Sequence, residues 1–138
     1  MKKTVFDGKQ WILELLNQSN VKTIISGKIY KDKRPIGSTK EDIVINALPM
    51  TSEFLQNGVF NVNCYVPHLS VKIDGIDQNM PNNVRLEAIS KAVYPVLEEV
   101  YKDNFNLEVD NHTTFEEEAE KASYINFRVS LNAYPTIN

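Results

Sequence analysis

Residues 81–101 read PNNVRLEAISKAVYPVLEEVY. Apolar side chains recur there every three to four residues, which is the spacing of one face of an α-helix. These are Ala88, Ile89, Ala92, Val93, Val96, Leu97, Val100 and Tyr101. We therefore predict a helix over residues 83–101 with one face in the core. Asn79, Asn82 and Asn83 are candidate caps, and Pro95 predicts a kink because proline removes a backbone donor.

On both sides of this stretch the apolar pattern changes to a period of two, which is the spacing of strands. The expected fold class is α+β, with a mainly antiparallel sheet packed on one long helix and a short N-terminal helix. The N-terminal helix is predicted from Asp7, as its cap, to about Asn17. Its apolar stripe consists of Trp11, Ile12, Leu15 and Leu16.

Three strands are expected between the two helices. The first begins at Ile24 and continues past Gly27 to Tyr30, the second covers residues 42–50 and the third covers residues 58–66. In the third strand Phe60, Val62, Cys64 and Val66 alternate with polar or aromatic residues. This alternation places Cys64 on the apolar face, where we interpret it as a small buried hydrophobe and not as a nucleophile.

Residues 67–80 are long for a connection inside a compact domain. Leu69, Val71 and Ile73 alternate with polar residues, and Asp74-Gly75 is a turn signal. Two interpretations stay open for this stretch. It is either a protruding hairpin arm, whose apolar side chains need another surface to lie against, or a hairpin folded onto its own domain.

The C-terminal part of the sequence predicts a hairpin. Residues 105–109 alternate, and the strand is extendable to residue 115. Residues 124–134 alternate more regularly, with Ile125, Phe127, Val129, Leu131 and Ala133 on one side. An acidic connector at residues 116–121 lies between the two strands. We expect one face of this hairpin to pack on the core.

Composition limits the function. The chain has 138 residues, which suits one domain over residues 1–138, with 42% hydrophobic and 24% charged residues, as in soluble globular proteins. A net charge of -3 argues against direct nucleic-acid binding. The lone Cys64 excludes an internal disulfide, and no apolar run is long enough to span a membrane.

Little catalytic chemistry is visible in the sequence. His68 and His112 lack metal-ligand spacing, and the five glycines form no phosphate-binding loop. No nucleophile elbow is present. The acidic connector lacks the spaced oxygen ligands and the turn glycine of a calcium loop. We therefore expect no enzyme, with no catalytic residue, no cofactor and no metal.

Charge is distributed unevenly along the chain. The early loop at residues 31–40 is basic, and the acidic connector comes late. Opposite patches on different sides of a protomer would allow head-to-tail association, which closes into a ring if the rotation fits. Alternatively, both patches are solvated, or they meet within one chain. The interface candidates in these segments and in the 67–80 stretch are Lys31, Lys33, Arg34, Val71, Ile73, Glu116, Glu117 and Glu118.

The order of elements resembles that of the tail terminator (tail completion, minor tail) proteins of long-tailed bacteriophages and prophages. The matching parts are residues 11–16, Gly27-Lys28-Ile29-Tyr30, Ile43-Val44-Ile45, residues 60–66, the helix from residue 83 and the final strand to Tyr134. The long 67–80 stretch and Pro95 depart from the pattern.

The resemblance implies a ring, typically a hexamer of identical chains, that caps the tail tube and ends its polymerisation. It implies three partners: the chain itself, the tail tube protein and a head completion or connector protein. The protein would then lie in the virion tail, after assembly in the cytoplasm of the bacterial host. Two alternatives stay open: another virion connector, such as a head completion or baseplate component, and a small ligand-binding α+β domain.

Overall fold

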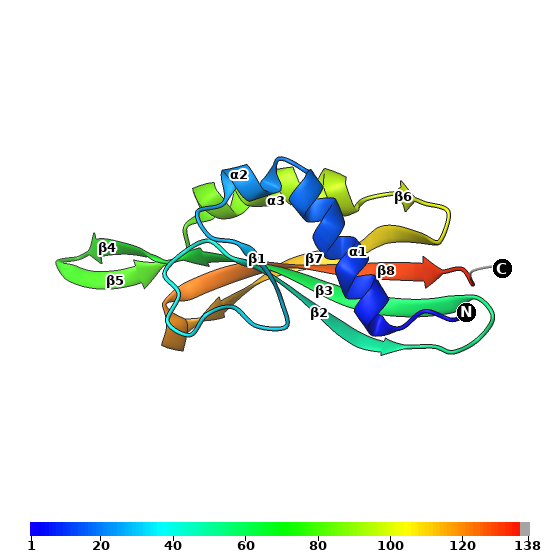
Figure 1. The fold of residues 1–138 in the computed structure, drawn as a ribbon. Coiled ribbons are helices and arrows are strands. Elements are labelled where there is room, and N and C mark those ends of the chain that lie inside the picture. Colours follow the sequence, from blue (N-terminus) through cyan, green and yellow to red (C-terminus); the bar gives the residue numbers. More distant parts are fainter. Residues whose placement is uncertain (136–138) are drawn as a thin grey trace.

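The computed structural model describes residues 1–135, so the last three residues of the predicted 1–138 domain lie outside the described range. The helical elements are α1 (Val5–Gln18), α2 (Val21–Ile24), α3 (Asn83–Leu97) and a 3₁₀ turn, η1 (Glu118–Glu120). The strands are β1 (Ile29–Lys31), β2 (Ile43–Met50), β3 (Gln56–Pro67), β4 (Leu69–Ile73), β5 (Ile76–Met80), β6 (Val100–Tyr101), β7 (Phe105–Glu117) and β8 (Ala122–Ala133). Figure 1 shows their arrangement.

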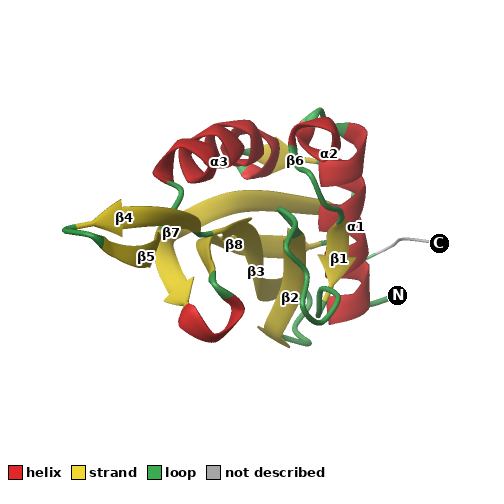
Figure 2. Ribbon diagram, turned by 90° about the vertical axis from the view of Figure 1, so that its left-hand side faces the viewer, coloured by secondary structure: helices red, strands yellow, loops and turns green. Residues whose placement is uncertain are grey.

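The predicted fold class, a sheet packed on one long helix, is wrong. Strands make up 44% of the chain and helices 27%, so the molecule is mostly β. Six strands in the order β1-β2-β3-β8-β7-β6 form a curled half-barrel, seen from the side in Figure 2. Two helices of almost equal length, α1 with 14 residues and α3 with 15, lie over the same side of the sheet.

The C-terminal end of α3 explains part of this error. The predicted helix extended to Tyr101, but α3 ends at Leu97, two residues after Pro95. Proline has no N–H to donate to the Lys91 carbonyl four residues earlier, so the last turn of α3 lacks one of its hydrogen bonds. Val100 and Tyr101 then pair with β7 as strand β6. The apolar residues with helical spacing therefore belong to two elements: those up to Leu97 lie in α3, and Val100 and Tyr101 lie in β6.

The face of α3 that contacts the core follows the predicted pattern. Ile89, Val93 and Leu97 are buried, and Val96 packs partly buried against the same cluster. At its start the Asn82 side chain accepts a hydrogen bond from the backbone N–H of Arg85 at 3.2 Å, which satisfies one otherwise unpaired donor. The caps and the apolar face of this helix were therefore visible in the sequence.

The first helix starts earlier than predicted, at Val5 and not at Asp7. Asp7 still takes part in capping, because its carboxylate accepts the backbone N–H of Thr4 at 2.7 Å. Gly8 allows α1 to lie close to the sheet. A Cβ added there would come within 2.2 Å of the Phe60 ring, so only glycine fits without a shift.

The strand predicted from Ile24 begins only at Ile29. Val21–Ile24 is a short helix, and β1 pairs with β2 in parallel, whereas the other neighbouring strands of the sheet are antiparallel. Gly27 lies against β2: an added Cβ would approach Asp42 Oδ1 to 1.9 Å and the Glu41 carbonyl oxygen to 2.6 Å. Close backbone packing, not strand geometry, requires glycine here.

The centre of the core agrees with the predicted alternation. Phe60 and Val62 of β3 and Phe127 and Val129 of β8 are fully buried beneath the helices. Cys64 is fully buried beside them, and burial raises the pKa of its thiol because the thiolate would be desolvated. The predicted C-terminal hairpin is confirmed as β7 and β8, which pair along their whole length with one bulge after Val109.

Candidate interaction surfaces

The 67–80 stretch forms a hairpin that stands apart from the main sheet. Strands β4 and β5 make a two-stranded sheet of their own, which projects beyond the half-barrel in Figures 1 and 2. Asp74 and Gly75 have φ values of 51° and 78°, as a tight two-residue turn with both residues left-handed requires. Of the two interpretations left open by the sequence, the projecting one is correct. We call residues 69–80 the arm.

One face of the arm is almost entirely apolar. Strand register places Leu69 opposite Met80, Val71 opposite Gln78 and Ile73 opposite Ile76. The alternate positions, Ser70, Lys72, Asp77 and Asn79, face the other way and are all polar. The exposed fraction reaches 64% at Ile76. An isolated hairpin is marginally stable in water, so an apolar face of this kind calls for a partner.

The root of the arm is fixed to the main sheet by His68. Its backbone N–H donates to the Lys121 carbonyl at 2.8 Å, and its Nε2 lies 2.8 Å from the Ser123 hydroxyl. A Ser–His contact is also found in hydrolases, but Ser123 is 1% exposed and His68 Nδ1 has no hydrogen-bond partner within residues 1–135. Because no acid orients the imidazole, we assign this pair to positioning the arm.

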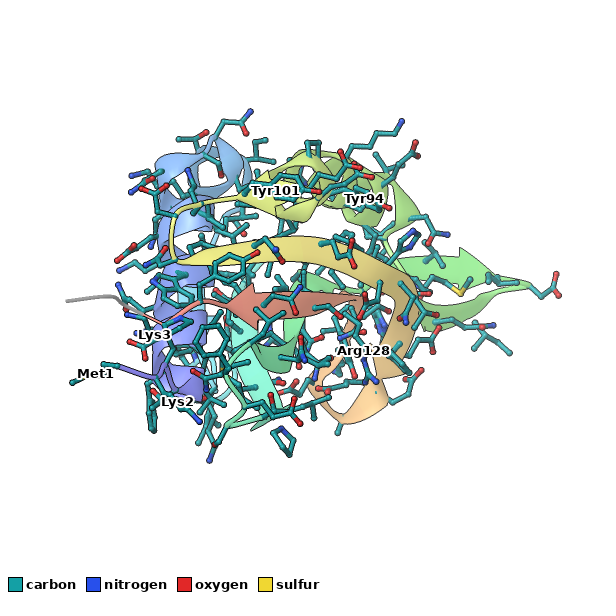
Figure 3. The ribbon with its side chains drawn as sticks, turned by 90° about the vertical axis from the view of Figure 1, so that its right-hand side faces the viewer. Met1, Lys2, Lys3, Tyr94, Tyr101 and Arg128 are labelled. Carbon is teal, nitrogen blue, oxygen red and sulfur yellow. The ribbon has the colours of Figure 1, made fainter. Side chains whose placement is uncertain are left out.

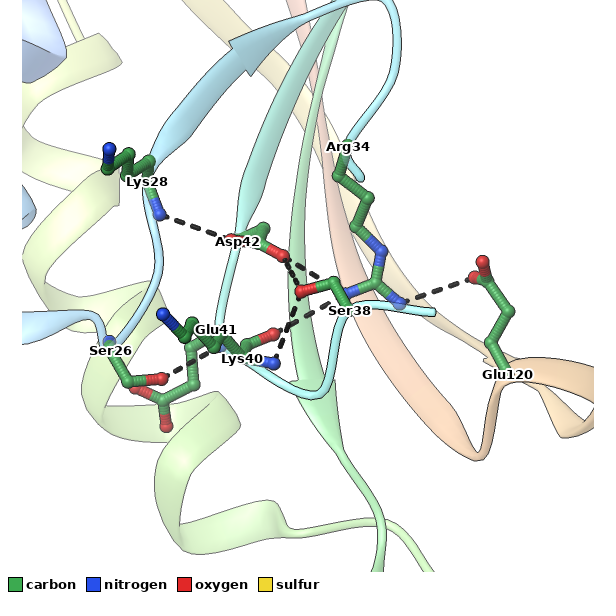
Figure 4. A network of polar contacts seen from close by, with 8 residues as sticks. All are labelled: Ser26, Lys28, Arg34, Ser38, Lys40, Glu41, Asp42 and Glu120. Atoms are coloured by element: carbon green, nitrogen blue, oxygen red, sulfur yellow. Dashed lines mark hydrogen bonds and ion pairs between the residues drawn. The ribbon is translucent and has the colours of Figure 1, made fainter. Parts of the chain in front are cut away.

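The basic loop, residues 31–40, is held by Arg34. The Arg34 side chain is only 6% exposed. Its guanidinium lies 3.6 Å from the Asp42 carboxylate and 3.3 Å from that of Glu120, as Figure 4 shows. It also lies 4.1 Å from the centre of the Tyr65 ring, a cation–π contact. The basic loop and the acidic turn therefore meet within one chain, and do not lie on opposite sides.

Asp42 and Glu41 tie the rest of this loop to its surroundings (Figure 4). Asp42 accepts the Ser38 hydroxyl at 2.5 Å and the backbone N–H of Lys28 at 3.1 Å. Glu41 forms two charge-assisted bonds with the Arg85 guanidinium, at 2.7 and 2.8 Å. These bonds hold the pKa of Glu41 below its ordinary value, since they favour the ionised carboxylate.

The other two basic candidates remain at the surface. Lys31 is exposed at the end of β1 and donates to the Gln10 side chain of α1. Lys33 is exposed, and its backbone N–H donates to the Lys31 carbonyl at 2.8 Å. Both keep their ammonium charges in contact with solvent, so their role in an interface stays a prediction.

The acidic turn joins β7 to β8 through η1. Glu116 and Glu118 are exposed, and Glu117 is half-buried. The hydrogen bond with Glu120, together with partial burial, raises the pKa of Glu117. The same hydrogen bond and the contact with Arg34 lower the pKa of Glu120. The two carboxyl groups therefore share a proton more readily than two separate ones would. Burial, with the nearby Glu117 charge, raises the pKa of Tyr65 to about 12.

The three predicted surfaces lie towards one end of the half-barrel. Arg34 connects the basic loop to the acidic turn, and His68 connects the arm to the first residues of β8, which follow that turn. Sequence separation concealed this proximity, because Arg34 and Glu120 are 86 residues apart. Whether these residues contact another protein stays a prediction.

Sequence reasoning missed the polar face of the sheet that is turned away from α1 and α3. An asparagine ladder crosses it: Asn61 donates to Asn46 at 2.9 Å, and Asn126 donates to Asn61 at 3.1 Å and to Asn63 at 2.7 Å. Next to the ladder Tyr65 and Phe115 lie on either side of Tyr124, with ring centroids 4.8 and 5.3 Å from it. The signal was the asparagines at polar alternate positions of two predicted strands, Asn61 and Asn63 in residues 58–66 and Asn126 in residues 124–134.

Within residues 1–135 no group of three or more potential ligands gathers in a way that would hold a metal ion. His68 packs at the root of the arm, whereas His112 lies against Tyr94 and Phe127, with ring centroids 5.6 and 5.8 Å away. In the same range, none of the helices combines the length and the apolar character needed to cross a bilayer.

Comparisons with known proteins find the fold but no sequence relative. No protein-family model matches the chain, and no curated protein matches its sequence. Among solved structures, the fold is similar to that of a chain from the virion of a native gene transfer agent particle, with a TM-score of 0.55 and 11% sequence identity. The match covers 90% of this chain and 92% of that chain. At this level of identity the likeness shows the fold alone.

Proposed function

We propose that this protein is a structural component of a phage-like virion. The observation that carries the proposal is the likeness to a chain of a gene transfer agent virion, which extends over nearly the full length of both chains. A match over whole chains argues that the complete architecture, and not one widespread motif, is common to both. The arm supports the proposal, because an exposed apolar hairpin suits a protein that works in contact with others.

Within the virion, we propose that the protein caps the tail tube. Copies of the chain form a ring, sixfold in the family that the sequence resembles, on the growing end of the tube. The ring ends polymerisation of the tube protein and presents a surface to a head completion or connector protein. This finer role rests on the resemblance of the element order to tail terminators.

The proposed mechanism is contact between complementary surfaces, without turnover or cofactor. Glu41, Glu117 and Glu120, whose pKa values are shifted, are each paired with an arginine or a second carboxylate in the contacts that hold the loops. We therefore interpret Arg34 and Arg85 as fixing the shape of the surfaces that partners would meet. The protein would act in the virion tail, after assembly in the host cytoplasm.

Electron microscopy of particles from a phage or induced prophage lacking this gene tests the proposal. We expect tails of abnormal length that fail to join heads, while heads still fill with DNA, and we expect a supplied copy of the gene to restore normal tails. Empty heads would instead indicate a head-side connector. Normal-length tails on full heads would refute the capping role.

A further inference from the structure

We infer that strand β4 of the arm adds to an unpaired edge of β7 in a second copy of this chain, as an antiparallel strand. The edge consists of residues 113–117, and we call it the open edge. The inference rests on the proposed self-association and deepens it, because it names the two strands that would join neighbouring copies.

Most of β7 has a neighbouring strand on one side only. Within residues 1–135, β8 pairs with β7 along its length, whereas β6 on the other side pairs only with Asn106 and Leu107. In Figure 3, where Tyr101 marks β6, β7 continues past that short strand. Residues 110–116 are all exposed. The described part of the chain thus places no strand beside the open edge.

The register shows which backbone groups of the open edge are unpaired. The N–H of Tyr134, directly after β8, donates to the Asn104 carbonyl at 2.9 Å, so the even-numbered residues of β8 bond towards β7. Past the bulge, the residues opposite them are Thr113, Phe115 and Glu117. Thr114 and Glu116 therefore turn their N–H and C=O groups away from β8. An exposed edge of this kind pairs readily with another strand.

Strand β4 has a matching free edge. In a hairpin closed by a two-residue turn, the residues that flank the turn bond to each other, here Ile73 and Ile76. The alternate residues Ser70 and Lys72 therefore turn their backbone groups away from β5. The arm is a sheet of two strands, so within residues 1–135 no strand pairs with that side of β4.

An antiparallel pairing brings these backbone groups together. Ser70 then stands opposite Glu116, and each exchanges both N–H···O bonds with the other. Lys72 stands opposite Thr114 in the same way. The whole of β4 lies along the open edge, over about 17 Å.

The same pairing joins two apolar surfaces. Val71 lies opposite Phe115, and side chains opposite each other in an antiparallel pair share a face. Phe115 is 47% exposed where it stacks on Tyr124. Leu69 and Ile73, exposed by 45% and 39%, lie on the same face of β4 as Val71. The apolar face of the arm would therefore continue the row of aromatic side chains and cover Phe115.

Charge favours β4 over the other free edges. Lys72 is the only charged residue of β4, and it would lie diagonal to Glu116. Its ion pair with Asp77 is loose, at 3.9 Å between exposed side chains. Strand β5 would instead bring Asp77 towards Glu116, and a second open edge would add the carboxylates of Glu116 and Glu117. Like charges on facing strands are destabilising, so both of these pairings are disfavoured.

The arm and the open edge of one chain lie on different sides of β8. Pro67, which leads into the arm, pairs with Ala122 from one side, and Glu117 pairs with it from the other. The arm then projects away from the half-barrel (Figures 1 and 2). We therefore assign the added strand to a second copy. Because the two surfaces differ, the contact is head-to-tail, and it generates a ring if the rotation closes.

Disulfide trapping tests this pairing. Ile73→Cys is introduced in one preparation and Thr113→Cys in another, because these residues would lie opposite each other without bonding through their backbones. Such pairs have Cα atoms about 4.5 Å apart, within the range of a disulfide. The two are mixed at high concentration and oxidised, since one strand pair is small beside the roughly 1,200–2,000 Å² of a stable complex. The native Cys64 is fully buried, so it does not compete.

Asn111→Cys replaces Thr113→Cys in the matched control, because Asn111 is exposed on the same face of β7 but lies beyond the end of the pairing. We expect dimers to form at least about 10-fold faster with Thr113→Cys, since the control pair is too far apart for a disulfide. Equal rates would overturn the pairing. Ile73→Cys or Thr113→Cys forming dimers faster alone than in the mixture would also overturn it, because two arms or two open edges would then pair.

A charge exchange tests the pairing without new thiols. In sedimentation experiments on the full chain, Lys72→Glu should weaken self-association by about 2- to 10-fold, and adding Glu116→Lys should restore it. Association that Lys72→Glu leaves unchanged, or that the double variant does not restore, would overturn the pairing. The capping role is tested separately by the deletion strain: specific trapping together with normal tails there would support the pairing and refute the capping role.

Discussion

Replacing Arg34 by alanine should destabilise the protein by about 3 kcal/mol. Removing one partner of a buried ion pair costs about 3–5 kcal/mol because the other charge is left unpaired. The cost is smaller here, since Asp42 keeps the Ser38 hydroxyl and the Lys28 N–H. Loss of the stacking on Tyr65 adds about 1 kcal/mol, and loss of the half-exposed Glu120 pair adds at most about 1 kcal/mol.

Urea denaturation followed by circular dichroism measures this cost. With an m-value of about 2 kcal/mol/M, the midpoint should fall by about 1.5 M while m stays constant. Lys33→Ala is the matched control, because Lys33 precedes Arg34 in the sequence, carries the same charge and is exposed. The expected change in its free energy of unfolding is within about 0.5 kcal/mol. If the two variants unfold at the same urea concentration, the Arg34 side chain is not held between the basic loop and the acidic turn.

Three further predictions concern the core and the loop contacts. Leu97→Ala should reduce the free energy of unfolding by about 2–5 kcal/mol because the side chain is fully buried, and a near-neutral result in the same urea assay would refute the packing of α3. Gly27→Ala should lower the melting temperature, since the added Cβ would meet the Asp42 carboxylate at 1.9 Å; an unchanged value would contradict that close approach. The hydrogen bonds from Arg85 lower the pKa of Glu41 from its ordinary value of 4.5. The pair therefore stabilises the folded protein fully above pH 4.5, and this stabilisation is lost as the pH falls through the folded-state pKa. Wild type should therefore lose more stability than Glu41→Gln between pH 5 and 3 in parallel urea titrations, and equal losses would argue against an ionised, paired Glu41.

The sequence predicted the elements that carry a clear period. The alternation around Phe60 and Phe127 identified two central strands and the side of each that is buried. The Asp74-Gly75 pair identified the turn of the arm, because few other residue pairs adopt two left-handed conformations in succession. These features depend on neighbours in sequence, and local patterns record them.

Features that depend on distant contacts could not be predicted. Nothing near Arg34 in the sequence indicates that its partner is Glu120, so the basic loop resembled a free patch. The apolar spacing continued through Val100, although that residue pairs with β7. The half-barrel arises from how six strands curl together, whereas periodicity reports only the face that each strand buries.

Cryo-electron microscopy of intact particles, with this chain fitted to the junction between head and tail, tests the central claim most directly. The account predicts a single ring of copies of this chain at the head-proximal end of the tail tube. Density for this chain in the baseplate or within the head, or its absence from purified particles, would contradict it.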